Sequence, residues 1–486
     1  MRRNSQPANI TDFTSSPNPD VAQIDLSESM TRAEKRATSG LAAIFGLRML
    51  GMFLILPVFA LYAEHLPGGD NHTLVGLTLG MYGLTQALLM IPFGMASDRI
   101  GRKKVIIFGL ILFAIGSFVA ASASDIYWTI AGRAIQGAGA ISAAITAMLA
   151  DLTREEHRTK AMAMIGSTIG LVFAASMVAG PALNHLIGVP GIFALTGVLA
   201  LAAIWVVKVW VPDPLVSHFH ADAQASPARL KDVLHNAQLL RLDFGIFALH
   251  AAQMAMFVVV PVALKDSGLP ANDHWAVYLP VLLGSFVLMV PALIYGEKRG
   301  QMKPVYIGAV ALMLAAQLGL AVGIESLWAI VWALFFYFVA FNLLEASLPS
   351  LISKLAPASA KGTAMGVYNT AQALGLFFGG FFGGWLAEHH GFTTVFVFCS
   401  VLIAVWLLAS LSMNAPPAVK TRLFRIGTLP PDQAALLKMQ LAEVSGVVEA
   451  SVLAEEGVAM LKVSLRGWDE AAARSLLDAA APAGLA

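Results

Sequence analysis

Twelve long apolar stretches, separated by short polar connections, dominate this chain of 486 residues. Each is close to the roughly 20 residues that an α-helix needs to cross the hydrocarbon core of a bilayer. The first six lie near residues 40–63, 73–96, 104–123, 127–150, 161–186 and 190–211. The second six lie near residues 243–264, 274–296, 304–323, 327–352, 362–387 and 392–412. Strands of a membrane barrel are about half this length, so the pattern predicts an all-α membrane protein with twelve transmembrane helices.

Composition agrees with a bilayer as the main partner of this chain. Hydrophobic residues make up 57% of the sequence and charged residues only 13%, against about 25% charged residues in a soluble domain. The net charge of +1 supplies no basic field for nucleic acid, so no nucleic-acid partner is expected. The single cysteine, Cys399, excludes an internal disulfide and is expected to be a buried thiol.

Basic residues alternate between the connections, and this alternation sets the expected orientation. The connections without Lys or Arg lie near 64–72, 122–127, 187–190, 324–326 and 388–391. The alternate connections carry Arg99, Arg102, Lys103 and Lys104, then Arg154, Arg158 and Lys160, then Lys298, Arg299 and Lys303, then Lys354 and Lys361. Lys265 is the one exception. Because basic loops stay in the cytoplasm, we expect an even number of spans and two cytoplasmic termini.

Changes in composition divide the chain into five parts. Residues 1–39 are polar and predict a disordered cytoplasmic tail. The polar stretch 212–241 is the longest internal connection. It predicts a cytoplasmic linker between two six-helix bundles, at 40–211 and 242–413.

Residues 414–486 predict a separate, small α+β domain in the cytoplasm. The pattern indicates a strand at 421–426, a helix at 430–444, a hairpin of 447–454 and 458–465 that turns at Glu455-Glu456-Gly457, and a helix at 468–480. This order is that of a ferredoxin-like domain without its last strand, and it resembles the heavy-metal-associated domain. The Cys-x-x-Cys of that domain is absent, so no metal site is expected. Regulation, assembly and stabilisation of the last span are alternative roles.

Ionisable residues inside predicted spans are costly and therefore suggest function, and three of them share one expected depth. Arg48, His250 and Glu345 each lie about seven or eight residues from the cytoplasmic end of a span. At 1.5 Å per residue, all three are expected roughly 10–12 Å below that face. One interpretation makes Glu345 or His250 the proton carrier and lets Arg48 tune its pKa. The alternative is a static charge network that fixes helix packing.

Further polar residues are candidates for a substrate cavity. Arg133 and Gln136 lie in a run of small residues in the fourth stretch, where they must face a cavity or polar partners. Tyr82 and Gln86 lie one turn apart in the second stretch. For this pair, hydrogen bonding between helices is the competing interpretation.

Enzyme signatures are missing from the sequence. It contains no Walker loop, no His-Glu-x-x-His and no Gly-x-Ser-x-Gly. The chain is therefore not expected to be an enzyme or to carry a cofactor. Energy for transport is expected to come from an ion gradient, with the proton as coupling ion, or from the gradient of the substrate itself.

Two motifs carry a family resemblance. The run from Gly94 to Lys104 matches the loop that marks the major facilitator superfamily between its second and third spans. The matching positions are Gly94, Asp98, Arg99, Gly101, Arg102 and Lys103. The run that starts at Arg133 resembles the fourth-span motif of the same family. The resemblance covers residues 40–412 and, with the C-terminal domain, is closest to drug:proton antiporters.

The resemblance implies a conformational latch. Asp98 would face the amino end of the eleventh span near Gly362 and Thr363, and Arg102 would reach Asp151, which together hold the outward-open state. A static salt bridge without gating is the alternative. The fifth-span motif departs from the antiporter pattern. Gly180-Pro181 is present, but Asn184-His185 stand in place of paired glycines and Ser176 replaces another glycine.

These observations predict a monomeric, proton-coupled transporter in the bacterial inner membrane. It is expected to export small amphipathic compounds or metabolites by alternating access. A proton symporter or facilitator for one metabolite is the alternative within transport. A membrane sensor, with the C-terminal domain as its ligand-binding module, is the alternative of another class.

Overall fold

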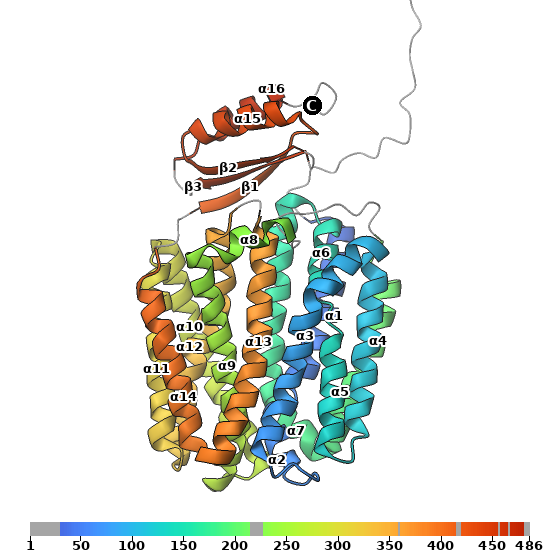
Figure 1. The fold of residues 1–486 in the computed structure, drawn as a ribbon, viewed down its shortest axis with the longest axis vertical. Helices are drawn as coiled ribbons and strands as arrows, with labels where there is room; N and C mark the ends of the chain where they lie inside the picture. The colour runs from blue at the N-terminus through green and yellow to red at the C-terminus, as the bar shows by residue number, and fades with distance from the viewer. Residues whose placement is uncertain are drawn as a thin grey trace, which may run out of the picture.

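The computed structural model describes residues 30–213, 227–357, 360–414, 419–454, 457–464 and 467–480. The predicted tail up to residue 29, the middle of the predicted linker, and the turn residues Glu455 and Glu456 lie outside the described residues. Long helices run side by side in one bundle, and a small sheet with two helices caps one end of it (Figure 1). We call this end the domain-bearing end and the other the opposite end.

The N-terminal half contains six crossings of the bundle. They are formed by α1 (Arg32–Phe53) with α2 (Phe59–Ala63), α3 (His72–Ile100), α4 (Arg102–Ala121), α5 (Ile126–Ala138) with α6 (Ser142–Leu152), and α7 (Glu155–Val209). Helix α7 supplies two crossings, because it bends at Gly188, whose φ of 68° is one that glycine adopts readily. The breaks between α1 and α2 and between α5 and α6 interrupt stretches that the sequence predicts as continuous.

The C-terminal half contains the other six crossings. They are α9 (Ala237–Asp266), α10 (Trp275–Arg299), α11 (Met302–Gly323), α12 (Leu327–Leu355), α13 (Lys361–His390) and α14 (Phe392–Leu411). The short helices α8 (Pro227–Leu234) and η1 (Ala271–Asp273) lie in connections. Helix α8 therefore occupies part of the predicted linker, and α9 begins before the predicted end of that linker.

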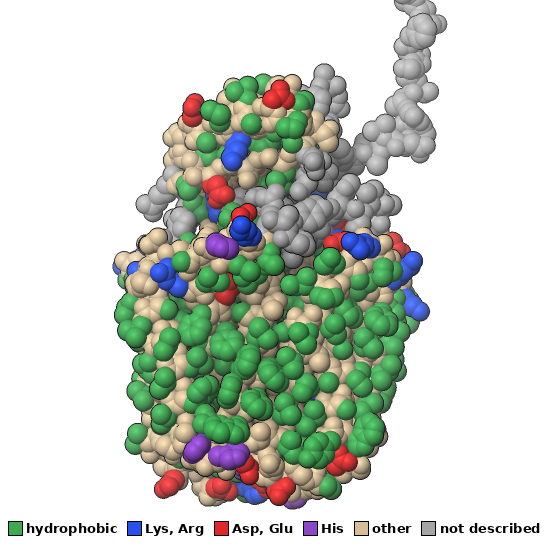
Figure 2. Space-filling model, viewed as in Figure 1, with side chains coloured by type: hydrophobic (Ala, Val, Ile, Leu, Met, Phe, Trp, Pro, Cys, Tyr) green, Lys and Arg blue, Asp and Glu red, His purple; other side chains and the backbone are tan. Residues whose placement is uncertain are grey.

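The surface of the bundle matches a bilayer. Nine helical segments in the described part of the chain are long and apolar enough to span one. The bent helix α7 is one of these segments but makes two crossings. The pair of α1 and α2 makes one further crossing and α13 makes another, which gives the twelve predicted crossings. Hydrophobic side chains cover the middle of the bundle, while charged side chains lie at its two ends (Figure 2). This distribution is that of a protein whose sides face lipid.

The C-terminal domain has the predicted order of elements. Strands β1 (Val419–Arg425), β2 (Val447–Leu453) and β3 (Val458–Ser464) form an antiparallel sheet in the order β1-β3-β2. Leu437 and Leu441 of helix α15 (Pro431–Glu443) and Leu477 of helix α16 (Glu470–Ala480) share a core with the sheet.

One lysine of the sheet attaches this domain to the bundle. Lys462 of β3 is buried and pairs with Glu449 at 3.0 Å. Its ammonium group also donates a hydrogen bond to the carbonyl oxygen of Ala356, directly after α12. A cation at the carboxyl end of a helix is favourable, because the exposed carbonyl groups there carry partial negative charge.

Candidate functional site: buried charges in two helical halves

A polar network lies where α9, α12 and α13 meet. Glu345 Oε2 lies 3.8 Å from Nε2 of His250. The side-chain amide of Gln372 lies 2.8 Å from the same His250 nitrogen and 3.5 Å from Glu345 Oε1. The other ring nitrogen of His250 lies 3.2 Å from the carbonyl oxygen of Ile246. This pattern assigns the proton of a neutral imidazole to Nδ1 and leaves Nε2 to accept from Gln372.

The network has one accessible member. The side chain of Glu345 is 25% exposed, whereas that of His250 is only 4% exposed. Glu345 is therefore the less buried of the two groups, although its Oε2, which faces His250, is itself buried. Protonation of His250 at Nε2 requires the amide of Gln372 to turn, because its N–H donor would then face another donor. Gln372 thus links the two groups that the sequence places at one depth.

A second cluster lies inside the N-terminal half. The guanidinium groups of Arg48 in α1 and Arg133 in α5 lie 5.6 Å and 4.8 Å from the centroid of the same Tyr82 ring. Arg48 donates to Ser142 Oγ at 2.7 Å and Arg133 donates to Gln136 Oε1 at 2.8 Å. Arg48 therefore contacts groups of its own half, and no ion pair joins it to Glu345 among the described residues.

The remaining cavity candidates surround this cluster. Gln136 donates to Ser117 Oγ at 2.8 Å, which holds the amide that Arg133 contacts. Gln86 is buried one turn after Tyr82, and its side-chain oxygen has no hydrogen-bond partner in the described part of the chain. The tyrosine hydroxyl likewise lacks a partner there. All four predicted residues are therefore buried in one half.

Aromatic side chains join the two halves. Phe173 of α7 packs against Phe53 at 5.1 Å within its own half and against Phe341 of α12 at 5.5 Å, measured between ring centroids. Phe341 in turn lies 6.0 Å from the ring of His250. An apolar, aromatic contact between the halves thus leads to the polar network.

The loop between α3 and α4 forms the expected ion pair. Arg102 is buried, and its Nε lies 3.0 Å from Asp151 Oδ2. The same guanidinium donates to Ser97 at 2.8 Å and pairs with Asp98. The side chain of Asp98 is 40% exposed, and its ion pair is with Arg102 rather than with the start of α13 near Gly362.

The other loop residues surround this ion pair. Gly101 adopts a φ of 107°, which favours glycine, and so permits the tight turn from α3 into α4. Lys103 pairs with Asp213 at 2.8 Å, whereas Arg99 is exposed. Gly94 lies close to α6, because a Cβ built there would be 3.4 Å from that of Ala143.

A further ion pair ties α1 to the start of α7 at the same end. Arg154 donates to both carboxylate oxygens of Glu34, with Nε and Nη2 each 3.1 Å away. Glu34 lies in the first turn of α1, before the first apolar stretch. Burial raises its pKa, but hydrogen bonds from Arg154 and from the backbone N–H of Thr31 outweigh burial and lower the pKa to about 2.

Contacts between the halves also close the opposite end. Glu64 pairs with Lys265 at 2.6 Å, and the backbone N–H of His72 donates to Glu388 at 2.7 Å. Below them, α3 and α13 touch through backbone atoms. A Cβ added at Gly380 would overlap the carbonyl oxygen of Gly76. One ion pair, one hydrogen bond to a carboxylate and a glycine interface therefore hold this end together.

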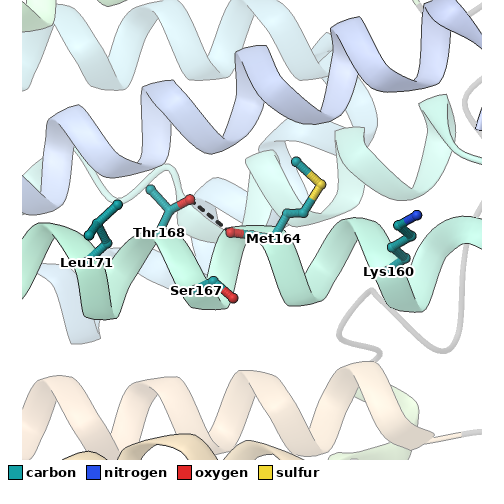
Figure 3. A pocket seen from close by; sticks show the side chains of 5 residues that line it. All are labelled: Lys160, Met164, Ser167, Thr168 and Leu171. Carbon is teal, nitrogen blue, oxygen red and sulfur yellow. Dashed lines mark hydrogen bonds between the residues drawn. The ribbon is translucent and has the colours of Figure 1, made fainter. Parts of the chain in front are cut away.

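A groove lies along the first half of α7. It has a volume of about 410 Å³ and is lined by Lys160, Met164, Ser167, Thr168 and Leu171, all from the first half of α7. Figure 3 shows these side chains along one stretch of the helix, with the hydroxyl of Thr168 bonded to the carbonyl oxygen of Met164. The contacts at the opposite end hold the two halves together there, whereas this groove leaves part of α7 unfilled.

The fold and site define a polytopic membrane protein in which two six-helix halves each bury charged groups. The family model described as Major Facilitator Superfamily matches residues 41–380 and 274–464. The chain belongs to this family. Because its members are transporters, the chain binds small-molecule substrates, and the prediction that it is not an enzyme is confirmed.

Individual relatives agree with this assignment. The chain is 44% identical over 437 residues to the inner membrane transport protein YajR of Escherichia coli, covering 89% of this chain and 95% of that protein. It is 26% identical to the multidrug resistance protein MdtH of Edwardsiella ictaluri, over 70% of this chain and 84% of that protein. A solved bacterial homologue of the human lysosomal transporter Spinster has the same fold. Its TM-score is 0.63 at 13% identity, covering 79% of this chain and 97% of that one.

Proposed function

We propose that this transporter is a proton-coupled exporter of small amphipathic compounds or metabolites in a bacterial inner membrane. The domain-bearing end and both termini face the cytoplasm in this proposal, because the basic connections lie at that end. The observation that carries the proposal is the network of Glu345, His250 and Gln372. An accessible carboxyl group beside a buried imidazole is a site where a proton can be taken up and released.

The geometry supports a specific division of labour. Glu345 takes up the proton, because it is the accessible member of the network. Gln372 of α13 couples the protonation state of the network to the contact between α9 and α13. Its amide can bond His250 of α9 only while the imidazole nitrogen is unprotonated. Because α13 also packs against α3 of the other half, a change in this network can bias the contact between the halves.

The loop at the domain-bearing end is proposed to act as the latch. In the described arrangement Asp98 pairs with Arg102 of its own half, and the opposite end is closed. We propose that Asp98 exchanges this partner for the start of α13 when the domain-bearing end closes. In this proposal the ion pair of Arg102 with Asp151 stays intact during the exchange.

Similarity to a named resistance protein supports the direction of transport. MdtH of Edwardsiella ictaluri is called a multidrug resistance protein, and drug resistance in a transporter arises from export. The departures of the fifth span from the antiporter pattern, at Ser176, Asn184 and His185, lie in α7, whereas the network of Glu345 lies in α9, α12 and α13. The proposal therefore rests on the network for coupling and on the relatives for direction.

Flux through purified, reconstituted protein tests the proposal. Compounds that stabilise the protein against heat would first be selected, and their flux measured with and without a pH gradient. We expect the gradient to drive accumulation by the natural protein. Glu345→Gln should abolish this accumulation while preserving exchange of labelled for unlabelled compound, because exchange needs no net proton movement.

Glu325→Gln is the matched control, since Glu325 is an exposed carboxylate in the connection before α12. This variant should transport as the natural protein does. Gradient-driven accumulation that survives Glu345→Gln would remove Glu345 from the coupling mechanism. Flux that ignores the pH gradient in the natural protein would refute proton coupling altogether.

A further inference from the structure

Two buried arginines in the N-terminal half have the same guanidinium nitrogens without a hydrogen-bond partner among the described residues. In both Arg48 and Arg133, Nη1 is held by a neutral oxygen, from Ser142 and Gln136 respectively. In both, the Nε and Nη2 groups are buried and lack a hydrogen-bond partner within the described residues. These two groups form the parallel fork with which an arginine binds a carboxylate or phosphate through two hydrogen bonds.

The cluster also lacks a counter-charge. Both guanidinium groups lie beside the Tyr82 ring, and neither has a carboxylate partner among the described residues. Glu345, the acid of the other half, is bonded to Gln372. Two buried guanidinium groups near one ring have lost their hydration and have no counter-charge, so binding of an anion beside them is strongly favoured.

The surroundings define what else the ligand contacts. The hydroxyl of Tyr82 has no partner among the described residues and can donate to an anion held beside its ring. Phe53, one and a half turns after Arg48 on α1, belongs to the aromatic contact with Phe173. A ligand with one charged oxygen group and an apolar or aromatic body fits both parts.

The groove on α7 borders the helix that carries Arg48. Its inner residue Thr168 packs against α1 at Gly46, where an added Cβ would lie 2.8 Å from the threonine methyl group. Gly46 is two residues before Arg48 in α1, so the two positions lie on opposite faces of that helix. The groove shown in Figure 3 therefore ends beside the helix that carries one of the two arginines.

From this arrangement we propose that Arg48, Arg133 and Tyr82 form the binding site for an anionic group on the transported compound. The substrate class is an organic oxyanion, a carboxylate or phosphate attached to an apolar body. This inference rests on the proposed transport function for the fate of the ligand. The binding site itself can be tested without transport.

Equilibrium binding to the purified, full-length protein in detergent tests the site. The probes are 2-naphthoate and 2-naphthyl phosphate. Two controls accompany them: 2-naphthamide, which has the apolar body without the charge, and inorganic phosphate, which has the charge without the apolar body. We expect at least one organic anion to raise the melting temperature with a dissociation constant at least tenfold below that of the amide. The two anions distinguish a carboxylate site from a phosphate site.

Substitutions then locate the binding. Arg48→Gln and Arg133→Gln should each weaken binding of the preferred anion roughly 10- to 100-fold, the loss expected for hydrogen bonds to a charged group. Arg48→Lys and Arg133→Lys keep the positive charge but cannot form two parallel hydrogen bonds. Their affinity for the anion should therefore lie between those of the natural protein and the glutamine variants. Arg299→Gln is the matched control, because Arg299 lies 4.9 Å from a tyrosine ring, that of Tyr295, at the surface.

The outcomes separate this inference from the proposed function. Equal binding of the anions and the amide, or unchanged anion binding in both glutamine variants, overturns the anion site. If the glutamine variants do not fold, the lysine variants and the comparison of anion with amide in the natural protein decide. Neither overturning result touches proton coupling, which depends on flux with and without a gradient.

Discussion

The glycine interface between α3 and α13 gives the sharpest prediction about conformational change. Gly380→Ala would place a methyl group against the carbonyl oxygen of Gly76 and 3.0 Å from the backbone nitrogen of Gly80. Backbone atoms cannot rotate away, so the helices must separate. Overpacking of this kind costs about 1–3 kcal/mol. That cost falls only on the state closed at the opposite end, and therefore shifts the equilibrium toward the open state roughly 5- to 150-fold.

Cysteine labelling measures this shift directly. Cys399 is buried, so a cysteine introduced elsewhere can be labelled over a low background. Ala387, seven residues after Gly380 on α13, is buried near the opposite end. The maleimide labelling rate of Ala387→Cys should rise at least about fivefold when Gly380→Ala is added.

Gly308→Ala is the control for this experiment. Gly308 also lies in a helix, α11, but a Cβ there meets no atom within 4 Å. It should leave the labelling rate unchanged. An equal rate with Gly380→Ala would show that the α3–α13 contact does not control opening of this end, and the reasoning would fail.

Three further predictions concern the ends and the network. Lys462→Met should release the C-terminal domain from α12, because it removes the ammonium group that contacts Ala356; faster proteolysis after α14 would confirm this, and unchanged proteolysis would contradict it. Glu34→Gln should lower the free energy of unfolding at pH 7 by an amount on the order of 2 kcal/mol, because Arg154 stabilises the carboxylate. Since the folded pKa of Glu34 lies below its usual value, the natural protein should lose this advantage as pH falls from about 5 toward 2, and a constant difference over that range would argue against it. Gln372→Leu should reduce gradient-driven flux more than exchange, whereas equal reduction of both would assign Gln372 to substrate binding.

The sequence predicts the architecture well because bilayer physics leaves few alternatives. A stretch of about 20 apolar residues must be helical in lipid, so the number of crossings follows from hydropathy. The ion pair of Arg102 with Asp151 follows from the loop motif and is present at 3.0 Å. The βαββα domain follows from short alternating patterns, and its elements begin and end within a few residues of those predicted.

Side-chain direction is harder to predict than depth. A rise of 1.5 Å per residue places Arg48 level with Glu345 but does not say which way either points. In the structure Arg48 faces Ser142 and Tyr82 of its own half, and Glu345 faces His250. The direction depends on how α1 packs against its neighbours, which no local pattern reveals.

Gln372 illustrates the same limit of local reasoning. It is a polar residue in a glycine-rich helix that also carries Asn369 and Thr370, and such a residue often bonds a neighbouring helix without further function. Only the packing of α13 between α3 and α9 brings its amide to His250 at 2.8 Å. A search for every amide side chain inside predicted spans would have found it, together with others such as Gln253, Gln317 and Asn342.

Distance measurements across the opposite end test the central claim, that protonation of Glu345 controls the contact between the halves. Spin labels at positions 70 and 266 lie on exposed residues of the two halves at this end. The distance distribution between them should change as pH is varied across neutrality in the reconstituted protein, and should become insensitive to pH in Glu345→Gln. The same pH dependence in both proteins, or a fixed distance in the natural protein, would contradict the account.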